Sequence, residues 1–312
     1  MKWQQGRKRP CFRQGTGVHT GPLILLALME GTVTAAVLAL TAVGLSLTFG
    51  IMRVVNVAHG EFFMLGAVLT WFVTQWMPGS PALAFAAALI ICPLIVAGFA
   101  VLADILILKR LNYQPEATIV ATIGILYVLQ QAALSFFGPD ARPVAAPFDF
   151  RIQLPWFGYS GYKLCVILAA QIVLGLVWLL LTRTRIGLIM RATQIDRDTA
   201  RAFGINVDYV YAGTFGLGAA LAAIAAVLVV PIQQAHYLMG GDPLLLSFIV
   251  VIIGGLGSLR GTLVAALFIG LLDGLLSTAF FFPPTFAKIV ATLLVALVLV
   301  FRPQGLFGKR PA

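Results

Sequence analysis

Long apolar runs alternate with short polar segments along almost all of this chain of 312 residues. A helix needs roughly 20 mostly apolar residues to cross the ~30 Å hydrocarbon core of a bilayer. Runs of about that length recur, so the pattern predicts an all-α polytopic membrane protein with about eight or nine membrane-spanning segments. The predicted segments are residues 23–50, 60–77, 82–108, 117–137, 163–181, 209–230, 244–256 (a short one), 261–280 and 286–301.

The composition supports a single membrane domain. Hydrophobic residues make up 60% of the chain and charged residues 10%, whereas roughly a quarter of the residues are charged in an ordinary soluble domain. No polar segment is long enough to hold a second folded domain. We therefore expect a membrane domain over residues 23–302, a short tail over 303–312, and a basic polar leader over 1–22 that is either disordered or added by a wrongly assigned start codon.

The net charge of +10 is better explained by orientation in a membrane than by nucleic-acid binding. Basic residues gather in segments that alternate onto one side of the predicted spans, namely Lys109, Arg110, the arginines between 182 and 208, Arg260, Arg302, Lys309 and Arg310. The opposite side carries only Arg142, Arg151, Lys163 and Lys288. Because cytoplasmic loops are enriched in Lys and Arg, the polar segment 182–208 and the C-terminus are predicted to be cytoplasmic.

The leader conflicts with this orientation. Counting spans back from a cytoplasmic C-terminus puts residues 1–22 outside if 23–50 is one span, yet the basic residues of the leader favour the inside. Either 23–50 contains a further break or the leader is an atypical extension, and the sequence leaves both open.

The polar segment 182–208, TRTRIGLIMRATQIDRDTARAFGINVD, is patterned as an amphipathic helix. Two sets of residues fall on separate faces at a 3.6-residue period: Leu188, Ala192, Ile195, Thr199 and Ala202 on one, and Arg191, Gln194, Arg197 and Arg201 on the other. We expect one helix over about 188–203, a left-handed Gly204 at its end and Asp208 capping the next apolar run. An apolar face held between two spans needs a partner, and a soluble cytoplasmic protein is the simplest one.

Two glycine-containing segments interrupt the apolar pattern. They are residues 53–61, RVVNVAHGE, and 253–261, IGGLGSLRG, with Gly254, Gly255 and Gly257 in the second. Each glycine costs a helix about 1 kcal/mol relative to alanine. Since irregular backbone at membrane depth is tolerated only where protein or a water-filled cavity satisfies it, interrupted spans point to a transport pathway.

Polar residues in the first interruption allow two interpretations. Asn56, His59 and Glu61 form the densest polar cluster near a span. One interpretation is a helix end at the cytoplasmic interface, with Asn56 satisfying backbone groups across a break at Gly60. The other is a hinge or gate that lines a pathway. Both can hold together.

Other polar residues lie inside the spans themselves. Asp273 lies in the middle of residues 263–279, where a carboxylate costs about 2.5–3.5 kcal/mol on an insertion scale. It should find a partner, such as Lys288, Arg260 or Ser277, and a structural pair is favoured over a proton relay. Gln130, within another span, is expected to form hydrogen bonds across helices. The outer loop 138–162 is rich in Pro, Gly and aromatic residues, which fits either an interfacial belt or a landing surface for an external protein.

Several kinds of chemistry are not indicated. The three histidines and three cysteines are scattered, so neither a metal site nor a disulfide framework is predicted. The chain has no GxxxxGK loop followed by Ser or Thr, no HExxH and no GxSxG pattern, so neither nucleotide binding, a cofactor nor enzymatic activity is expected. Energy for uphill transport must therefore come from a partner or an ion gradient.

The chain resembles the permease subunits of bacterial branched-chain amino acid ABC importers, of the LivH type. The resemblance covers residues 30–309, apart from the leader that members of this family generally lack. The segments that carry it are ALTAVGLSLTFGIMRVVNVAHGEFFMLGA (39–67), ATIGILYVLQQAALSFFG (121–138), MRATQIDRDTARAFGINV (190–207), VVIIGGLGSLRGTLVAALFIGLLDGL (250–275) and FRPQGLFGK (301–309).

The resemblance implies a subunit of the bacterial inner membrane that works with a second, similar permease, two cytoplasmic ATPases and a periplasmic substrate-binding protein. It also implies that the polar segment is the coupling helix that docks into the ATPase, with Arg191, Ala192, Asp196, Ala200 and Gly204 matching the family pattern. The segments 56–61 and 254–257 match family signatures near the pathway.

The implied activity is translocation of leucine, isoleucine and valine by alternating access driven by the ATPase partners. Urea, short amides or other amino acids are alternative substrates. A stand-alone ion-coupled transporter would need charged sites at the membrane centre, for which Asp273 is the clear candidate. An intramembrane enzyme would need polar groups clustered on neighbouring spans, and only the cluster near His59 is offered.

Overall fold

The computed structural model describes residues 20–77, 79–279, 283–302 and 305–307, and every structural statement below concerns these residues. The helices are α1 (Thr20–Met52), α2 (His59–Trp76), α3 (Pro81–Ala103), η1 (Asp104–Leu108), η2 (Lys109–Leu111), α4 (Pro115–Phe137), α5 (Gly161–Arg183), α6 (Arg185–Ile195), α7 (Arg197–Ala202), α8 (Val207–Gln233), α9 (Gly241–Gly254), α10 (Leu259–Gly274), η3 (Leu275–Ala279) and α11 (Pro284–Phe301). The strands are β1 (Arg151–Gln153) and β2 (Gly158–Ser160).

The protein is mostly helical, as predicted, and six of its described helical stretches are long and apolar enough to cross a membrane. These are Gly21–Met52, Pro81–Leu111, Pro115–Phe137, Gly161–Arg183, Val207–Gln233 and Leu259–Thr278. The predicted eight or nine spans are not confirmed. Helix α9 has 14 residues, about 21 Å at 1.5 Å per residue, which is short of the ~30 Å core. In α2, His59, Glu61 and Gln75 make the ends of an 18-residue helix polar.

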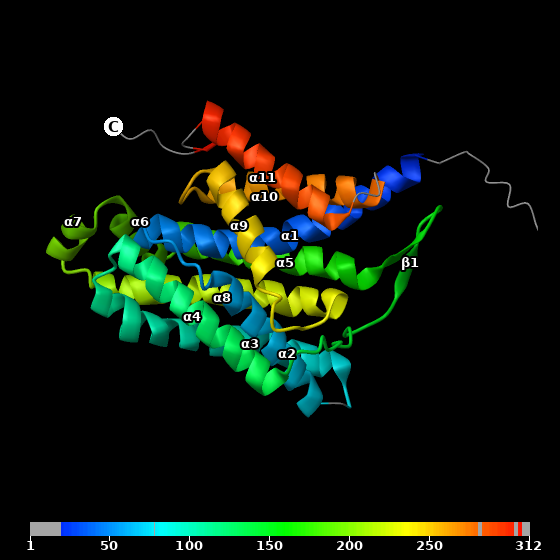
Figure 1. The fold of residues 1–312 in the computed structure, drawn as a ribbon, viewed down its shortest axis with the longest axis horizontal. Coiled ribbons are helices and arrows are strands. Elements are labelled where there is room, and N and C mark those ends of the chain that lie inside the picture. Colours follow the sequence, from blue (N-terminus) through cyan, green and yellow to red (C-terminus); the bar gives the residue numbers. More distant parts are fainter. Residues whose placement is uncertain (1–19, 78, 280–282, 303–304, 308–312) are drawn as a thin grey trace, which may run out of the picture.

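Helices α1 and α8 form the centre of the bundle (Figure 1). Helix α1 packs against α8, α9 and α10, while α8 also packs against α2 and α3. Small residues allow the two central helices to approach closely, since a Cβ on Gly44 would lie 2.6 Å from the backbone oxygen of Gly218. Large apolar side chains stay exposed on the outer helices, among them Leu94, Val120, Val128 and Leu168. Such a surface fits the hydrocarbon of a bilayer.

Helix α1 is continuous from Thr20 to Met52, so the further break that would have reconciled the basic leader with a cytoplasmic side is absent. Its N-terminal end lies at the opposite end of the molecule from α6 and α7 (Figure 1). Residues 1–19 lie outside the described residues, and the conflict over their side stays open.

A small antiparallel hairpin is an exception to the all-α prediction. Strands β1 and β2 pair with Ile152 opposite Tyr159, and the Leu154 N–H donates to the Phe157 carbonyl across the turn. The outer loop is also fastened to the bundle by a backbone bridge between Arg142 and Ala235. The all-α prediction missed this hairpin because the loop was assigned from its composition, which does not report strand pairing. The bridge to Ala235 could not be seen locally, because it joins residues far apart in the chain.

Candidate functional site

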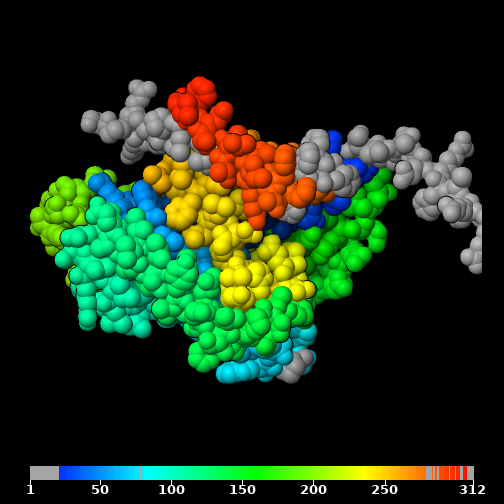
Figure 2. All heavy atoms as spheres, in the orientation of Figure 1, coloured from blue at the N-terminus to red at the C-terminus, as the bar shows by residue number. Residues whose placement is uncertain are grey.

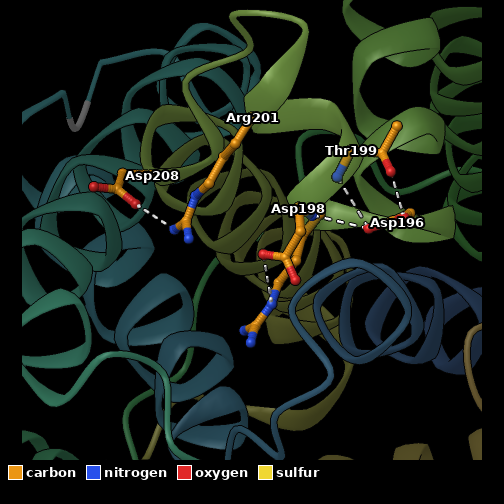
Figure 3. Close-up of polar contacts among 6 residues, drawn as sticks. Asp196, Asp198, Thr199, Arg201 and Asp208 are labelled. Carbon is orange, nitrogen blue, oxygen red and sulfur yellow. Dashed lines mark hydrogen bonds and ion pairs between the residues drawn. The ribbon is translucent and has the colours of Figure 1, made fainter.

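Helices α6 and α7 connect α5 to α8 and lie at one end of the bundle (Figure 1). The Thr184 hydroxyl accepts a hydrogen bond from the Gly187 N–H and caps α6. The Asp196 carboxylate caps α7 by accepting from the N–H groups of Asp198 (2.9 Å) and Thr199 (3.1 Å), while the Thr199 hydroxyl donates to it at 2.5 Å (Figure 3). The hydroxyl and backbone bonds from Thr199, then the backbone bond from Asp198, lower the pKa of Asp196.

The single helix predicted over about 188–203 is therefore two helices. Asp196 has an extended backbone (φ −150°, ψ 109°), because its side chain takes the N–H groups that open α7 and so begins a new helix. Gly204 is left-handed at φ +81°, as predicted. Asp208 is not the cap of the following helix, since Asn206 fills that position by accepting from the Tyr209 N–H.

Asp208 instead joins three elements by ion pairs in the first turn of α8. Its carboxylate lies 3.2 Å from Lys109 Nζ of η2. It also lies 3.5 Å from the Arg201 guanidinium of α7, as Figure 3 shows. A carboxylate at a helix N-terminus is also stabilised by the helix dipole. The end of α3, the start of α8 and α7 are thereby linked.

The residues matched to the coupling-helix pattern do not share one face. Arg191 and Asp196 are exposed, Ala192 is partly buried, and Ala200 is buried. Ile186 (61%) and Ile189 (37%) of α6 are exposed apolar side chains. So are Leu188 (61%), Ile195 (77%) and Phe203 (83%). We call Leu188, Ile195 and Phe203 the exposed apolar set. It lies among exposed arginines, so this end of the molecule presents both apolar and basic groups.

The inner side of α6 contacts both interrupted segments. The Arg53 guanidinium donates to the Gln194 carbonyl at 3.5 Å, and the Gln194 side-chain amide donates to the Gly257 carbonyl at 3.5 Å. Gly50 and Gly257 touch so closely that a Cβ on Gly50 would lie 3.0 Å from Gly257 Cα. Three segments singled out in the sequence therefore meet at one place.

The first interruption is an irregular link over residues 53–58 between α1 and α2. Asn56 Oδ1 accepts from the Ala58 N–H at 3.1 Å, which confirms that Asn56 satisfies backbone groups at a helix end. The helix begins at His59 rather than breaking at Gly60. Gly60 is needed for packing, because a Cβ there would lie 2.8 Å from Leu244 Cβ in α9.

The remaining polar residues of this cluster are buried against α1. His59 Nε2 lies 2.9 Å from the Thr41 carbonyl, and its Nδ1 has no hydrogen-bond partner among the described residues. Glu61 is 3% exposed and its Oε2 has no partner within the described part of the chain. The contact between His59 and Thr41 therefore joins the start of α2 to α1.

The second interruption is a tight turn between α9 and α10. Gly255 (φ +101°) and Gly257 (φ +77°) both have left-handed φ values that favour glycine. The N–H groups of Leu306 and Phe307 donate to the carbonyls of Ile253 and Gly254. Leu306 and Phe307, which belong to the segment FRPQGLFGK (301–309), are therefore hydrogen-bonded to this turn.

A cavity of about 340 Å³ lies at the opposite end, between α1, α8, α9, α10 and α11. In Figure 2, α1 (blue) is visible in the recess between α11 (orange) and the yellow segment that precedes α9. Two ion pairs lie in its lining: Lys163 Nζ to Glu30 Oε1 at 2.7 Å and Lys288 Nζ to Asp242 Oδ2 at 2.6 Å.

Asp273 also lines this cavity, but it has no ion pair within 4 Å among the described residues. Lys288 attracts Asp273 electrostatically from beyond that distance, while its direct ion pair is with Asp242. Ser277 donates to the Asp273 backbone carbonyl rather than to its carboxylate. Arg260 lies in the first turn of α10, at the other end of that helix.

Sequence reasoning missed Glu30, Lys163 and Asp242 as cavity residues. Glu30 offered a signal, since it is a carboxylate inside the first apolar run, as Asp273 is inside a later one. Gln130 is partly buried on α4, which packs on α2, and it does not line the cavity.

The apolar helices of this architecture define a polytopic membrane protein. Residues 27–299 match the family described as "Branched-chain amino acid transport system / permease component", and the chain belongs to that family. Its members named below are transport permeases, not enzymes.

Two of the three relatives described here match the chain over nearly its full length. The chain is 29% identical to the high-affinity branched-chain amino acid transport permease BraD of Pseudomonas aeruginosa, over 91% of this chain and 96% of BraD. It is 27% identical to the LivH permease of Escherichia coli K12, with the same coverage. It is also 32% identical to the galactofuranose transporter permease YtfT of that organism, over 49% of this chain and 47% of YtfT.

Proposed function

We propose that this protein is the membrane permease subunit of an ATP-driven importer for branched-chain amino acids. The supporting observation is the family match over residues 27–299, together with relatives named as branched-chain amino acid permeases along nearly their full lengths. Because the chain has no nucleotide-binding motif, ATP hydrolysis falls to separate subunits. The working complex contains a second, similar permease, two cytoplasmic ATPases and a periplasmic binding protein.

The α6–α7 end is the cytoplasmic side in this proposal, and the complex lies in the bacterial inner membrane with the C-terminus in the cytoplasm. Lys109, Arg201 and the other arginines of 182–208 gather there, as the bias of Lys and Arg toward cytoplasmic loops predicts. The cavity then opens toward the periplasmic side, where a binding protein delivers substrate.

The exposed apolar set is the ATPase contact. Leu188, Ile195 and Phe203 are mostly exposed outside the membrane-spanning helices, and a partner protein that covers apolar side chains removes them from water, which is favourable. Movement of this contact would reach the pathway through Gln194, which touches both interrupted segments. The spans on either side would then rock about those irregular links, as in alternating access.

The test is uptake by the complete complex in proteoliposomes, assembled with the binding protein and ATPases encoded beside this gene. ATP-dependent accumulation of L-leucine, L-isoleucine or L-valine is expected, with none when the ATPases are left out. A cysteine at Phe203 should crosslink to the ATPase. Accumulation of urea or a short amide in place of all three amino acids would show that branched-chain amino acids are not the substrate. Crosslinking of the Phe203→Cys protein only to external proteins would show that the α6–α7 end is not cytoplasmic.

A further inference from the structure

The cavity at the end opposite α6 and α7 is lined by charged side chains, and one of them has no ion-pair partner within 4 Å among the described residues. Three carboxylates (Glu30, Asp242 and Asp273) and two ammonium groups (Lys163 and Lys288) line it, together with the imidazole of His236. The two lysines pair with Glu30 and Asp242. Asp273 is left without a cation within 4 Å among the described residues, so the lining has one carboxylate more than it has ammonium groups.

The rest of the lining is mainly apolar. Its apolar side chains include Val33, Val37, Leu38, Val229, Ile232 and Leu246. The volume of about 340 Å³ is at the lower end of the range of roughly 300–1,000 Å³ for small-molecule sites. A ligand of this site is therefore small, has a hydrophobic part, and carries at least one positive group.

We propose that this cavity binds the zwitterion of a free amino acid with an apolar side chain, with Asp273 receiving its ammonium group and Lys288 its carboxylate. The proposal rests on the proposed import function and adds a substrate subsite within this chain. A substrate ammonium supplies the cation that Asp273 lacks, and the apolar lining takes the branched side chain.

The ion pair of Lys288 is compatible with this role. Its partner Asp242 has a side chain that is 69% exposed, so water can replace the ammonium as the partner of Asp242 when the substrate carboxylate arrives. An ammonium group has three donors and can also contact both carboxylates at once. Asp273 and Lys288 come from α10 and α11 respectively, so the two halves of the zwitterion would bind to different helices.

The lining also argues against other small solutes. A sugar has no ammonium group for Asp273 and no hydrocarbon side chain to cover the apolar part of the lining. Urea has no ammonium group for Asp273, no carboxylate for Lys288 and no apolar side chain. A zwitterionic amino acid is also neutral overall, but it places an ammonium beside Asp273, a carboxylate beside Lys288 and a hydrocarbon side chain against the apolar lining.

The decisive measurement is equilibrium binding of radiolabelled L-leucine to the purified complex of permeases and ATPases, with the binding protein left out. The wild type should bind L-leucine saturably, and L-isoleucine should compete. Asp273→Asn and Lys288→Gln should each weaken binding about tenfold or more, as expected for loss of a hydrogen bond to a charged group. Asp273→Glu should recover most of the affinity.

Competition by two analogues separates direct contact from a merely structural role. In the wild type, 4-methylpentanoate, which lacks the ammonium group, should compete poorly with L-leucine. In Asp273→Asn it should compete as well as L-leucine does, because the uncompensated carboxylate is gone. Isopentylamine, which lacks the carboxylate, should likewise gain relative to L-leucine in Lys288→Gln.

The matched control is Glu116→Gln, which removes an exposed carboxylate in the first turn of α4. Equal L-leucine affinity in Asp273→Asn, Lys288→Gln and Glu116→Gln would overturn the subsite, as would the absence of saturable binding in the wild type. Failure of the proposed function is separate: it would appear as no ATP-driven uptake of any branched-chain amino acid by the wild-type complex, whatever the binding result.

Discussion

The ammonium group of Lys109 lies 3.2 Å from the carboxylate of Asp208, which joins the end of the α3 span to the start of α8. Arg201 of α7 contacts the same carboxylate at 3.5 Å. Asp208 is thus the polar connection between α7, which lies in the proposed ATPase contact, and two spans that pack against each other.

Replacement of this carboxylate should weaken coupling. In Asp208→Asn the two cations lose their shared partner, so α7 can move without moving α3 and α8. We expect leucine uptake to fall several-fold while ATP hydrolysis by the complex continues. The measurement is the ratio of leucine imported to ATP hydrolysed in proteoliposomes. Glu116→Gln should keep the wild-type ratio, and an unchanged ratio in Asp208→Asn would remove Asp208 from the coupling route.

A buried charge behind α7 should also uncouple transport. Ala200 is 4% exposed, so the carboxylate of Ala200→Asp would be desolvated and would displace α7 from the bundle. Gly204→Pro should act similarly, because proline cannot adopt the φ of +81° found at Gly204. Both proteins should still insert in the membrane, as judged by membrane fractionation, but uptake should be abolished. Normal uptake in both would refute the assignment of α6 and α7 to coupling.

The contact between Gly50 and Gly257 should be sensitive to one methyl group. Gly257→Ala puts a Cβ about 2.8 Å from Gly50 Cα and forces alanine to a φ of +77°, a strain of about 1–3 kcal/mol. The melting temperature of the detergent-solubilised protein should fall. Gly213→Ala is the matched control, because its added Cβ has no described atom within 4 Å apart from its chain neighbours and its own helix backbone. Alanine also favours a helix by about 1 kcal/mol relative to glycine. A Gly257→Ala protein as stable as Gly213→Ala would contradict the close packing.

The stability of the first turn of α7 should fall in strong acid, because protonation of Asp196 removes its helix cap. The hydrogen bonds from Thr199 and Asp198 lower the pKa of Asp196 in the folded protein, so its capping contribution is complete above the unfolded pKa of about 3.9 and is lost as the pH falls through the lower folded pKa. Amide hydrogen exchange of α7, corrected for intrinsic rates, should therefore accelerate only in strong acid. Asp196→Asn should lack this pH dependence, and identical profiles for the two proteins would exclude carboxylate capping.

The outer loop should depend on Arg142. Its guanidinium lies 4.3 Å from the centre of the Trp71 ring and 4.8 Å from that of Phe137, and such contacts contribute about 0.5–1 kcal/mol at accessible sites. Arg142→Gln should lower the melting temperature slightly, whereas Arg151→Gln, at an exposed strand position, should not. The backbone bridge to Ala235 should persist in both. Equal melting temperatures would mean that the ring contacts add nothing.

Much of the helical layout could be predicted from the chain because it depends on local properties. The length of each apolar run predicted the long helices. Gly204 has the left-handed backbone expected after α7. Asn56 accepts a backbone hydrogen bond at the start of α2, as expected. The same local reasoning failed at Asp196, where an amphipathic period suggested one helix. Periodicity reports which face is apolar, but it does not report that a carboxylate will take the N–H groups of a new first turn.

The sequence by itself determined that this is a polytopic helical membrane protein with two interrupted segments and a basic, amphipathic connection, since hydropathy, glycine and charge act over a few neighbouring residues. Only the tertiary structure decided which polar groups meet. Lys163 pairs with Glu30 across 133 positions, and Lys288 pairs with Asp242 rather than Asp273. Gln194 contacts Gly257 across 63 positions. These choices follow from how the helices pack, because a charge pairs with the group that packing brings nearest.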